Sequence, residues 1–522
     1  MQHSNELAEL IRSMSKQEKR YFSLYASAFT RSRDSAALRL FKRLAGGSSP
    51  QSDAEWRELL TECGGKNPSA LKHRLHMQVL DSMASWHAED SVENRLTRRL
   101  GHVDVLYRKR RLAACLALCD EVCAEATHFE LHATLLRALQ WRRRVLLRLI
   151  PAEFEQHMRQ NAAAVKQTLA DCTHANIYLD QVGLFYTAVY KPARTKDEAS
   201  AARLEQLMRD PMMTETDAVE SFTARLHLLK AHAFYAWMRE ARGEALAWYK
   251  QIVDHWDSAP HRIGDAAAVF SADVCNYLTC CIAERRTEQF ADLLRRITDL
   301  NNKLRDGEIF RLDRIAFLEL SFHLNRGMLK EALELVPVIL DGLQRHGARL
   351  NPSRRLMLYF NCAMALLLKG EYSRALTALL EVMDGGPDAV RSDIRDAARI
   401  LRLPVHFELE DFDLLDRLIH AQRPHSDSAP ATPSYGPAVT TCLKQALAGH
   451  GLDSSLLTEL RSTLLDILDQ ADGTPAPGLP ELLFWAESKL THRPIADVFT
   501  AGARSDTLRD PRALFRRSGA RT

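Results

Sequence analysis

The sequence predicts an all-α protein, and three observations lead to this. Apolar residues recur with helical spacing through almost the whole chain of 522 residues, as Leu7, Leu10 and Ile11 do near its start. No stretch convincingly alternates apolar and polar residues as a half-buried strand does. Two windows, 327–333 and 370–376, match in register and indicate a repeated unit.

Each window begins with a glycine and has an alanine five residues later. Gly327 and Gly370 follow apolar helical stretches, and glycine tolerates the positive φ with which many helices end. Ala332 and Ala375 are small enough for two helices to approach closely. A hairpin of two helices cannot bury its apolar faces alone, so copies stack on one another. The sequence therefore predicts a right-handed α-solenoid of helical hairpins.

A small helical segment, residues 1–91, is expected before the solenoid. Ser15 and Glu18 have the spacing of a capping box, which starts a helix over 16–30. Glycine- and proline-containing breaks then separate three more periodic stretches. These are expected helices near 35–45, 53–63 and 68–88.

The predicted solenoid spans residues 92–422. Turns near Arg286, Gly327, Gly370 and Glu410 are spaced by 41, 43 and 40 residues. Earlier turns, such as the one near Arg110, are less regular. The expected pairs before Gly327 are 103–109 with 111–126, 131–149 with a helix after Pro151, 177–190 with 199–208, 218–239 with 244–256, and 265–283 with 287–300.

This unit resembles the tetratricopeptide repeat (TPR). In that family a small residue closes the first helix. A small and then a large apolar residue follow in the second helix, which often has a proline at its end. The matching residues are Gly370, Ala375, Leu379 and Pro387 in one copy and Gly327, Ala332, Val336 and Ile339 in another, with partial matches over 245–252 and 115–122.

The chain departs from the family in two respects. Its spacing exceeds the usual repeat of about 34 residues, and most copies lack the aromatic signature of the first helix. The opening residues 10–22 are also similar to the start of a group of uncharacterised bacterial TPR-like proteins. That second resemblance implies no function.

The C-terminal part changes in composition. Four prolines among small polar residues predict a linker over 423–437. Helices near 438–449, 453–471 and 479–490 predict a C-terminal helical cap, residues 438–500. The tail 501–522 carries six arginines and few large apolar residues, so it is expected to be disordered.

Composition and charge limit the classes of function. The hydrophobic share of 46% and charged share of 26% are ordinary for a globular protein, and a net charge of +3 implies no global field for nucleic acid or membranes. Residues 1–150 nevertheless hold 25 Lys and Arg against 17 Asp and Glu. The basic runs 108–111 and 142–144 fit either a solvated surface or contact with phosphate or an acidic partner.

The expected location is the cytoplasm. Residues 1–20 have no apolar signal region, and the longest apolar runs, such as 362–368, are far shorter than a membrane span. None of the ten cysteines shows C-x-x-C spacing, and with the expected cytoplasmic location this predicts reduced thiols. The short apolar runs predict no membrane contact.

No catalytic motif is present, so the sequence predicts no enzyme and no cofactor. Cys115, Cys119 and Cys123 share one helix face, where a soft metal is conceivable but burial in the core is the preferred interpretation. His128 and His132 are expected to share a helix face at i, i+4, without the pattern of a zinc protease. The sequence therefore predicts no metal site.

Two interpretations of function remain. The inward positions of the clear repeats, Phe317, Ser321, Phe360 and Met364, form an apolar groove for a protein or peptide, or else pack neighbouring helices. The preferred prediction is thus a protein-interaction scaffold or adaptor. The alternative is a regulator whose N-terminal helices bind nucleic acid, with Lys72 and Arg74 contacting phosphate, while the solenoid senses a peptide or protein.

Overall fold

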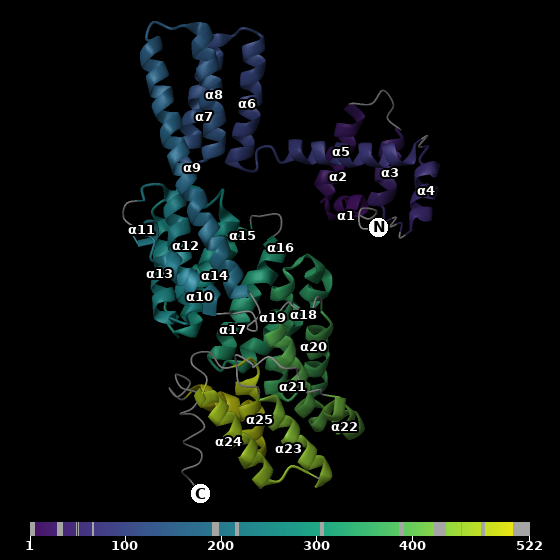
Figure 1. Ribbon diagram of the computed structural model, residues 1–522. Helices are drawn as coiled ribbons and strands as arrows, with labels where there is room; N and C mark the ends of the chain where they lie inside the picture. Colours follow the sequence, from purple (N-terminus) through teal and green to yellow (C-terminus); the bar gives the residue numbers. More distant parts are fainter. Residues whose placement is uncertain are drawn as a thin grey trace. The chain divides into compact units, whose positions relative to one another are not determined.

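Helices make up the secondary structure of the described chain. The computed structural model describes residues 6–28, 35–47, 50, 52–64, 67–190, 198–214, 219–302, 307–385, 391–421, 435–449, 451–470 and 476–504 (Figure 1). Within these ranges there is no strand, which confirms the predicted all-α class. None of the helices described there has the length and apolar character that a membrane span requires.

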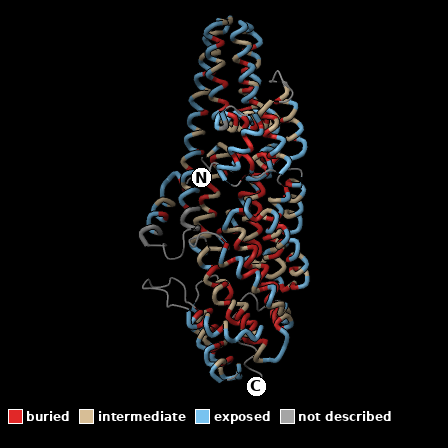
Figure 2. The backbone as a smooth tube through the Cα atoms, turned by 90° about the vertical axis from the view of Figure 1, so that its right-hand side faces the viewer, coloured by how far each residue is buried: buried red, intermediate tan, exposed pale blue. Residues whose placement is uncertain are grey.

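The chain forms two compact units, residues 1–173 and 174–522. This boundary falls inside the stretch that the sequence assigns to one solenoid. In both units the buried residues follow one side of the helices and exposed residues the other (Figure 2). Most helices therefore contribute an amphipathic face to a local core, whereas residues 362–368 are buried all round.

The first unit begins with five helices that share one hydrophobic cluster. The capping box forms as predicted: Ser15 N donates to Glu18 Oε2 over 2.7 Å and Glu18 N donates to Ser15 Oγ over 3.2 Å. The helices are α1 (Glu6–Ser13), α2 (Lys16–Ala28), α3 (Ala36–Ala45), α4 (Asp53–Glu62) and α5 (Pro68–Trp86).

A second cluster of the same unit lies among α6 (Val92–Arg108), α7 (Leu112–His128) and α8 (His132–Leu149). Each of these helices packs against the other two. The start of α9 (Phe154–Tyr190) joins this cluster through Ala164 and Val165.

Helix α9 corrects one prediction. The sequence predicts separate helices after Pro151 and over 177–190, whereas the structure has one helix of 37 residues. The stretch 164–176 contains neither glycine nor proline, so nothing in the backbone interrupts the helix there.

In the second unit, helices follow one another as packed neighbours. Each of the pairs α12–α13, α14–α15, α17–α18, α19–α20 and α21–α22 is in contact. The first helices of successive pairs also touch, α14 with α17, α17 with α19, and α19 with α21. Their bounds are α10 (Glu198–Met208), α11 (Pro211–Thr214), α12 (Phe222–Met238), α13 (Arg242–Asp257), α14 (Ala267–Ala283), α15 (Phe290–Asn301), α16 (Gly307–Phe310), α17 (Ala316–Asn325), α18 (Leu329–His346), α19 (Pro352–Lys369), α20 (Tyr372–Asp384), α21 (Ser392–Glu408) and α22 (Phe412–Ala421).

One turn conformation recurs between helices in both units. Its central residue has a φ between 52° and 85°, and the next N–H donates to the carbonyl five residues earlier, as Glu371 N does to Leu366 O over 2.9 Å. This is the Schellman pattern that satisfies the last carbonyls of a helix. The central residues are Arg110, Glu130, Glu240, Arg285, Gly327, Gly370 and Glu410.

The residue five positions after each of these turns is buried. Ala332 and Ala375 are fully buried, as their small size predicts. The corresponding residues elsewhere are Cys115, Leu135, Ala245, Phe290 and Leu415. The turn and the buried position therefore recur at sites where the sequence has no glycine.

The C-terminal helices are α23 (Gly436–Ala448), α24 (Ser454–Gln470), α25 (Leu479–Thr491) and α26 (Ile495–Arg504). They share one hydrophobic cluster with α17 to α22. Helix α26 was not predicted, and it includes residues 501–504 of the expected tail. The rest of that tail and most of the proline-rich linker lie outside the described residues.

Candidate interaction face of the first helices

The four predicted groove residues lie together where α17 meets α19. Phe317, Phe360 and Met364 are buried in the largest hydrophobic cluster, with at most 8% of each side chain exposed. Ser321 is half-buried. In the structure three of the four therefore pack between neighbouring helices, and their side chains do not line an open groove.

Polar side chains cover this packed layer. Asn361 Nδ2 donates a hydrogen bond to Ser321 Oγ over 3.2 Å, linking α19 to α17. The Arg354 guanidinium carbon lies 4.4 Å from the centre of the Phe317 ring. Both Asn361 and Arg354 are half-buried. A partner that approaches this junction would meet these polar groups first.

Neither Arg354 nor Asn361 was among the residues predicted for the groove. Arg354 has a counterpart in the preceding repeat, Arg311, whereas the position that matches Asn361 is Leu318. Asn361 is adjacent to the predicted Phe360, yet its contact with Ser321 depends on how α17 and α19 pack. Only the tertiary structure places them together.

The chain's own helix α25 lies on another part of the first helices. Both α25 and α26 contact α19. Leu482, Leu483 and Trp485 of α25 are buried with at most 2% exposed, in the same cluster as Leu401 of α21. The first helices thus accommodate a helix on this face, held by apolar burial.

A carboxylate at the end of α21 holds α25 in place. Glu408 Oε1 accepts a hydrogen bond of 2.8 Å from Trp485 Nε1, and Lys489 Nζ donates to Glu408 Oε2 over 2.7 Å. Tyr372 of α20 also hydrogen-bonds to Glu408, and burial together with this carboxylate raises the pKa of the Tyr372 phenol. One carboxylate therefore joins three elements.

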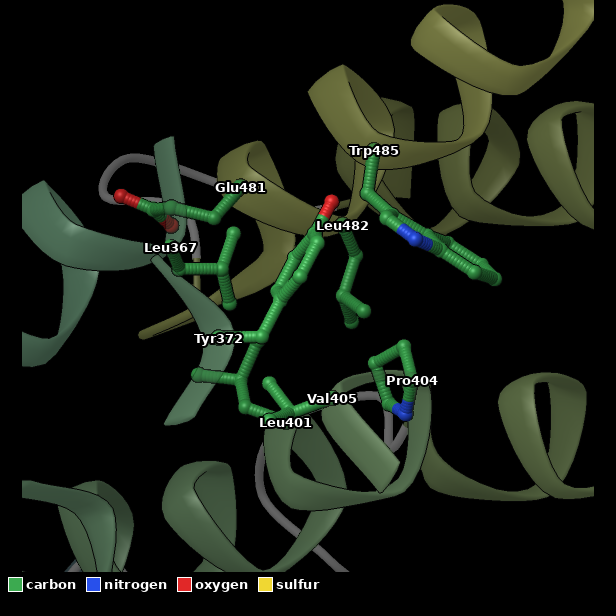
Figure 3. Close-up of a pocket in the computed structure, with 8 residues that line it drawn as sticks. All are labelled: Leu367, Tyr372, Leu401, Pro404, Val405, Glu481, Leu482 and Trp485. Atoms are coloured by element: carbon green, nitrogen blue, oxygen red, sulfur yellow. The ribbon is translucent and has the colours of Figure 1, made fainter. Parts of the chain in front are cut away.

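A small pocket marks the seam between α25 and the repeat helices (Figure 3). Tyr372, Leu482 and Trp485 face Leu401 and its neighbours on α21 in this view. The side chains leave no space for a water molecule. Burial raises the pKa of Glu481, which also lines the seam.

Gly478 allows the chain to approach α21 closely just before α25 begins. Its φ is +84°, and a Cβ placed there would lie 2.8 Å from Leu401 Cδ1 and 2.9 Å from the Tyr435 hydroxyl oxygen. Only glycine fits both the backbone conformation and the space.

A second polar cluster lies between α12, α13 and α14. Asp273 is buried. It accepts a hydrogen bond from Trp256 Nε1 and forms an ion pair with Lys230 Nζ, each at 2.9 Å. Burial raises the pKa of Asp273 despite the Lys230 ammonium. The partners of this carboxylate are internal, so the cluster links the three helices to one another.

The cysteines of α7 occupy core positions. Cys115 and Cys119 are fully buried, Cys123 is half-buried, and burial raises the pKa of all three thiols, that of Cys123 to about 11. Neutral thiols are poor metal ligands. Within the described residues, no group of three or more His, Cys, Asp or Glu side chains is placed to hold a metal ion.

The histidine prediction is wrong in its geometry. His128 ends α7 and His132 begins α8, so the two residues do not share a helix face. The turn between them contains Glu130 at φ +52°. The expected helices 111–126 and 131–149 already leave a break here, so the i, i+4 spacing of the two histidines does not place them on one helix.

The N-terminal residues considered for nucleic acid have different surroundings. Lys72 Nζ lies 4.1 Å from the centre of the Trp56 ring, and burial lowers its pKa. Arg74 is exposed. Leu71, Leu75 and Val79 form the buried stripe of α5. The contact between Lys72 and Trp56 weighs against a role of Lys72 in phosphate binding.

Comparison with known protein families, with curated proteins and with solved structures finds no match for this chain.

Proposed function

We propose that this protein is an interaction scaffold or adaptor without chemistry of its own, built as a right-handed solenoid of TPR-like hairpins. A partner protein binds with an amphipathic helix on the row of first helices. The observation that carries this proposal is the seating of α25 on α19, because it is a helix bound on that face.

We propose the junction of α17 and α19 as the binding region. Helix α25 occupies the part of the face that includes Leu401 of α21. Ser321, Asn361 and Arg354 lie half-buried at the other part. These side chains supply hydrogen bonds and a positive charge above an apolar layer, which suits the polar edge of an amphipathic helix.

Site-specific photocrosslinking in the native cell tests this. A benzophenone amino acid replaces Ser321 at the proposed face, and in a matched control it replaces Val338, which is exposed on α18. We expect a discrete crosslinked protein from the Ser321 position and not from the Val338 position. Identical crosslinking patterns from the two positions would contradict the proposal.

A mobility-shift measurement with the full chain tests the alternative function, a regulator whose N-terminal helices bind nucleic acid. Phosphate contacts make binding strongly dependent on salt. If Arg74→Glu abolishes a salt-dependent shift of DNA or RNA, the N-terminal helices bind nucleic acid and the scaffold is the wrong description of that segment. We expect no such shift from residues of α5.

A further inference from the structure

Helix α8 carries an unusual excess of positive charge. Its 18 residues include five arginines and no aspartate or glutamate. Only Arg142 among the five has an ion-pair partner in the described structure, Asp120, at 2.6 Å. The other four, Arg137, Arg143, Arg144 and Arg148, are all exposed.

The end of α6 extends this charge. Arg108 ends α6, and Lys109, Arg110 and Arg111 follow in the turn; all four are exposed. Arg108 pairs with Asp104 within its own helix, and the other three have no acidic partner among the described residues. Several uncompensated cations at close range repel one another, and an anionic ligand relieves that repulsion.

Ring contacts bring the ends of α6 and α8 side by side. The rings of Tyr107 and Trp141 lie 5.6 Å apart. Arg148 lies over Tyr107 and Arg144 over Trp141, each with its guanidinium carbon 5.1 Å from the ring centre. These contacts hold two guanidinium groups in fixed positions at the surface. We call the residues Arg137, Arg143, Arg144 and Arg148 with Leu147 the arginine face.

Aliphatic side chains are exposed in the same place. Leu147 is 55% exposed between the arginines of α8, and Ile150, which ends that helix, is 69% exposed. A ligand that covers this surface gains from having apolar groups as well as negative charge.

From these observations we propose that the arginine face binds an acidic amphipathic helix of a partner protein. Arg137, Arg144 and Arg148 are spaced by seven and four residues, so they share one side of α8 over about 16 Å. Glutamates one or two turns apart on a partner helix match this spacing. Guanidinium groups bind carboxylates through two parallel hydrogen bonds.

Other polyanions fit less well. Single-stranded nucleic acid requires open aromatic rings for stacking, whereas Tyr107 and Trp141 are half-buried and covered by arginines. A phosphate backbone also offers no apolar partner for Leu147. Membrane-surface helices carry basic residues on one face and leucine or aromatic residues on the other, whereas Leu147 lies between the arginines of α8. The proposal concerns the first unit and does not depend on the function proposed for the first helices of the second.

Fluorescence anisotropy with the full chain tests the proposal. The probe is a labelled synthetic helix with a glutamate-rich face and a leucine face. Comparison ligands are its lysine counterpart, a labelled single-stranded oligodeoxynucleotide and phosphatidylserine-containing vesicles. We expect binding of the acidic helix that weakens with added salt, and at least about tenfold weaker binding by the double variant Arg144→Glu, Arg148→Glu.

The matched control is the double variant Arg159→Glu, Arg209→Glu. Both of these arginines are exposed in helical ion pairs and the change in net charge is the same. We expect this control to bind like the parent. Leu147→Ser, which leaves the charge unchanged, should weaken binding severalfold because the apolar contact is lost.

Circular dichroism and a thermal melt establish that each variant folds, and Arg144→Gln with Arg148→Gln replaces any double variant that does not. Equal weakening by the control variant would overturn the proposal, since net charge would then explain binding. So would absence of binding to the acidic helix. Tighter binding of the oligonucleotide or the vesicles, lost in the same double variant, would reassign the arginine face to nucleic acid or to a membrane.

Discussion

The indole Nε1 of Trp485 donates a 2.8 Å hydrogen bond to Glu408 Oε1 across 77 residues of sequence. The same carboxylate pairs with Lys489 over 2.7 Å. Both partners belong to α25, so Glu408 is the polar link between the C-terminal helices and α21. The apolar burial of Leu482 and Trp485 surrounds this link.

We expect Glu408→Gln to destabilise the second unit by about 1–3 kcal/mol, because Lys489 then keeps a partly buried charge without a carboxylate. Urea unfolding monitored by tryptophan fluorescence measures this. The control is Glu371→Gln, which removes an exposed ion pair with Arg374 and should change stability by about 0–1 kcal/mol. Equal effects of the two variants would contradict a buried role for Glu408.

The recurring turn predicts opposite effects of two substitutions on stability. Gly370→Ala should destabilise by about 1 kcal/mol through backbone strain alone, because an added Cβ meets nothing within 4 Å. Glu410→Gly should stabilise by about 0.5–1 kcal/mol, because Glu410 holds a φ of +57° with a Cβ present. Thermal melts of the two variants test the pair. Shifts of the melting temperature in the same direction would show that backbone strain at the turn does not determine the change in stability.

Overpacking tests the close approach of helices at the repeats. Ala375 is fully buried, so Ala375→Trp should destabilise by about 1–3 kcal/mol or more. Leu380 lies on the same helix and is 43% exposed, so Leu380→Trp should leave the melting temperature nearly unchanged. An unchanged melt for Ala375→Trp would mean that the helix contact is absent.

The burial of the cysteines of α7 leads us to expect that they bind no metal and react slowly with alkylating reagents. Metal analysis should find no stoichiometric zinc or iron, and Cys119→Ala should leave the metal content unchanged. About one ion per chain, lost in that variant, would overturn the core interpretation.

The pH dependence of Cys123 follows from its raised pKa. The folded pKa is about 11, against an unfolded value of about 8.5. The fold therefore favours the neutral thiol, and this contribution to stability is complete below about pH 8.5 and is lost as the pH rises toward 11. Iodoacetamide labelling with mass spectrometry should show slow modification of Cys123 at pH 8. Urea unfolding of Cys123→Ser should show a smaller loss of stability between pH 9 and 11 than the parent, as expected when that titration is absent.

Local signals in the sequence predicted local structure well. The capping box of Ser15 and Glu18 and the turns at Gly327 and Gly370 depend on residues close in sequence. The expected helices left breaks around Glu130 and Glu240, but the positive φ of these residues was not predicted, because it is held by residues other than glycine or proline. The predicted turn at Arg286 was displaced by one residue, to Arg285, for the same reason.

Features that depend on tertiary contacts could not be predicted. The burial of Phe360 depends on how α17 and α19 meet, and periodicity alone does not distinguish a groove from a packed interface. The partners of Glu408 lie 77 and 81 residues away. The arginine face was visible only as the run 142–144, and the structure adds Arg148 and its contact with Tyr107.

Because one turn recurs with different central residues, we expect the chain to unfold in blocks of different stability. The turn at Gly370 carries no Cβ strain and lies in the largest cluster, whereas the turns at Arg110 and Glu130 carry that strain beside a smaller one. In native-state hydrogen exchange, the amide of Glu371 should therefore open only with its whole block, and that of Arg111 by earlier, local unfolding. The helices that carry the arginine face belong to the block that we expect to unfold more readily. Binding of a partner there would therefore appear first as slower hydrogen exchange of their amides.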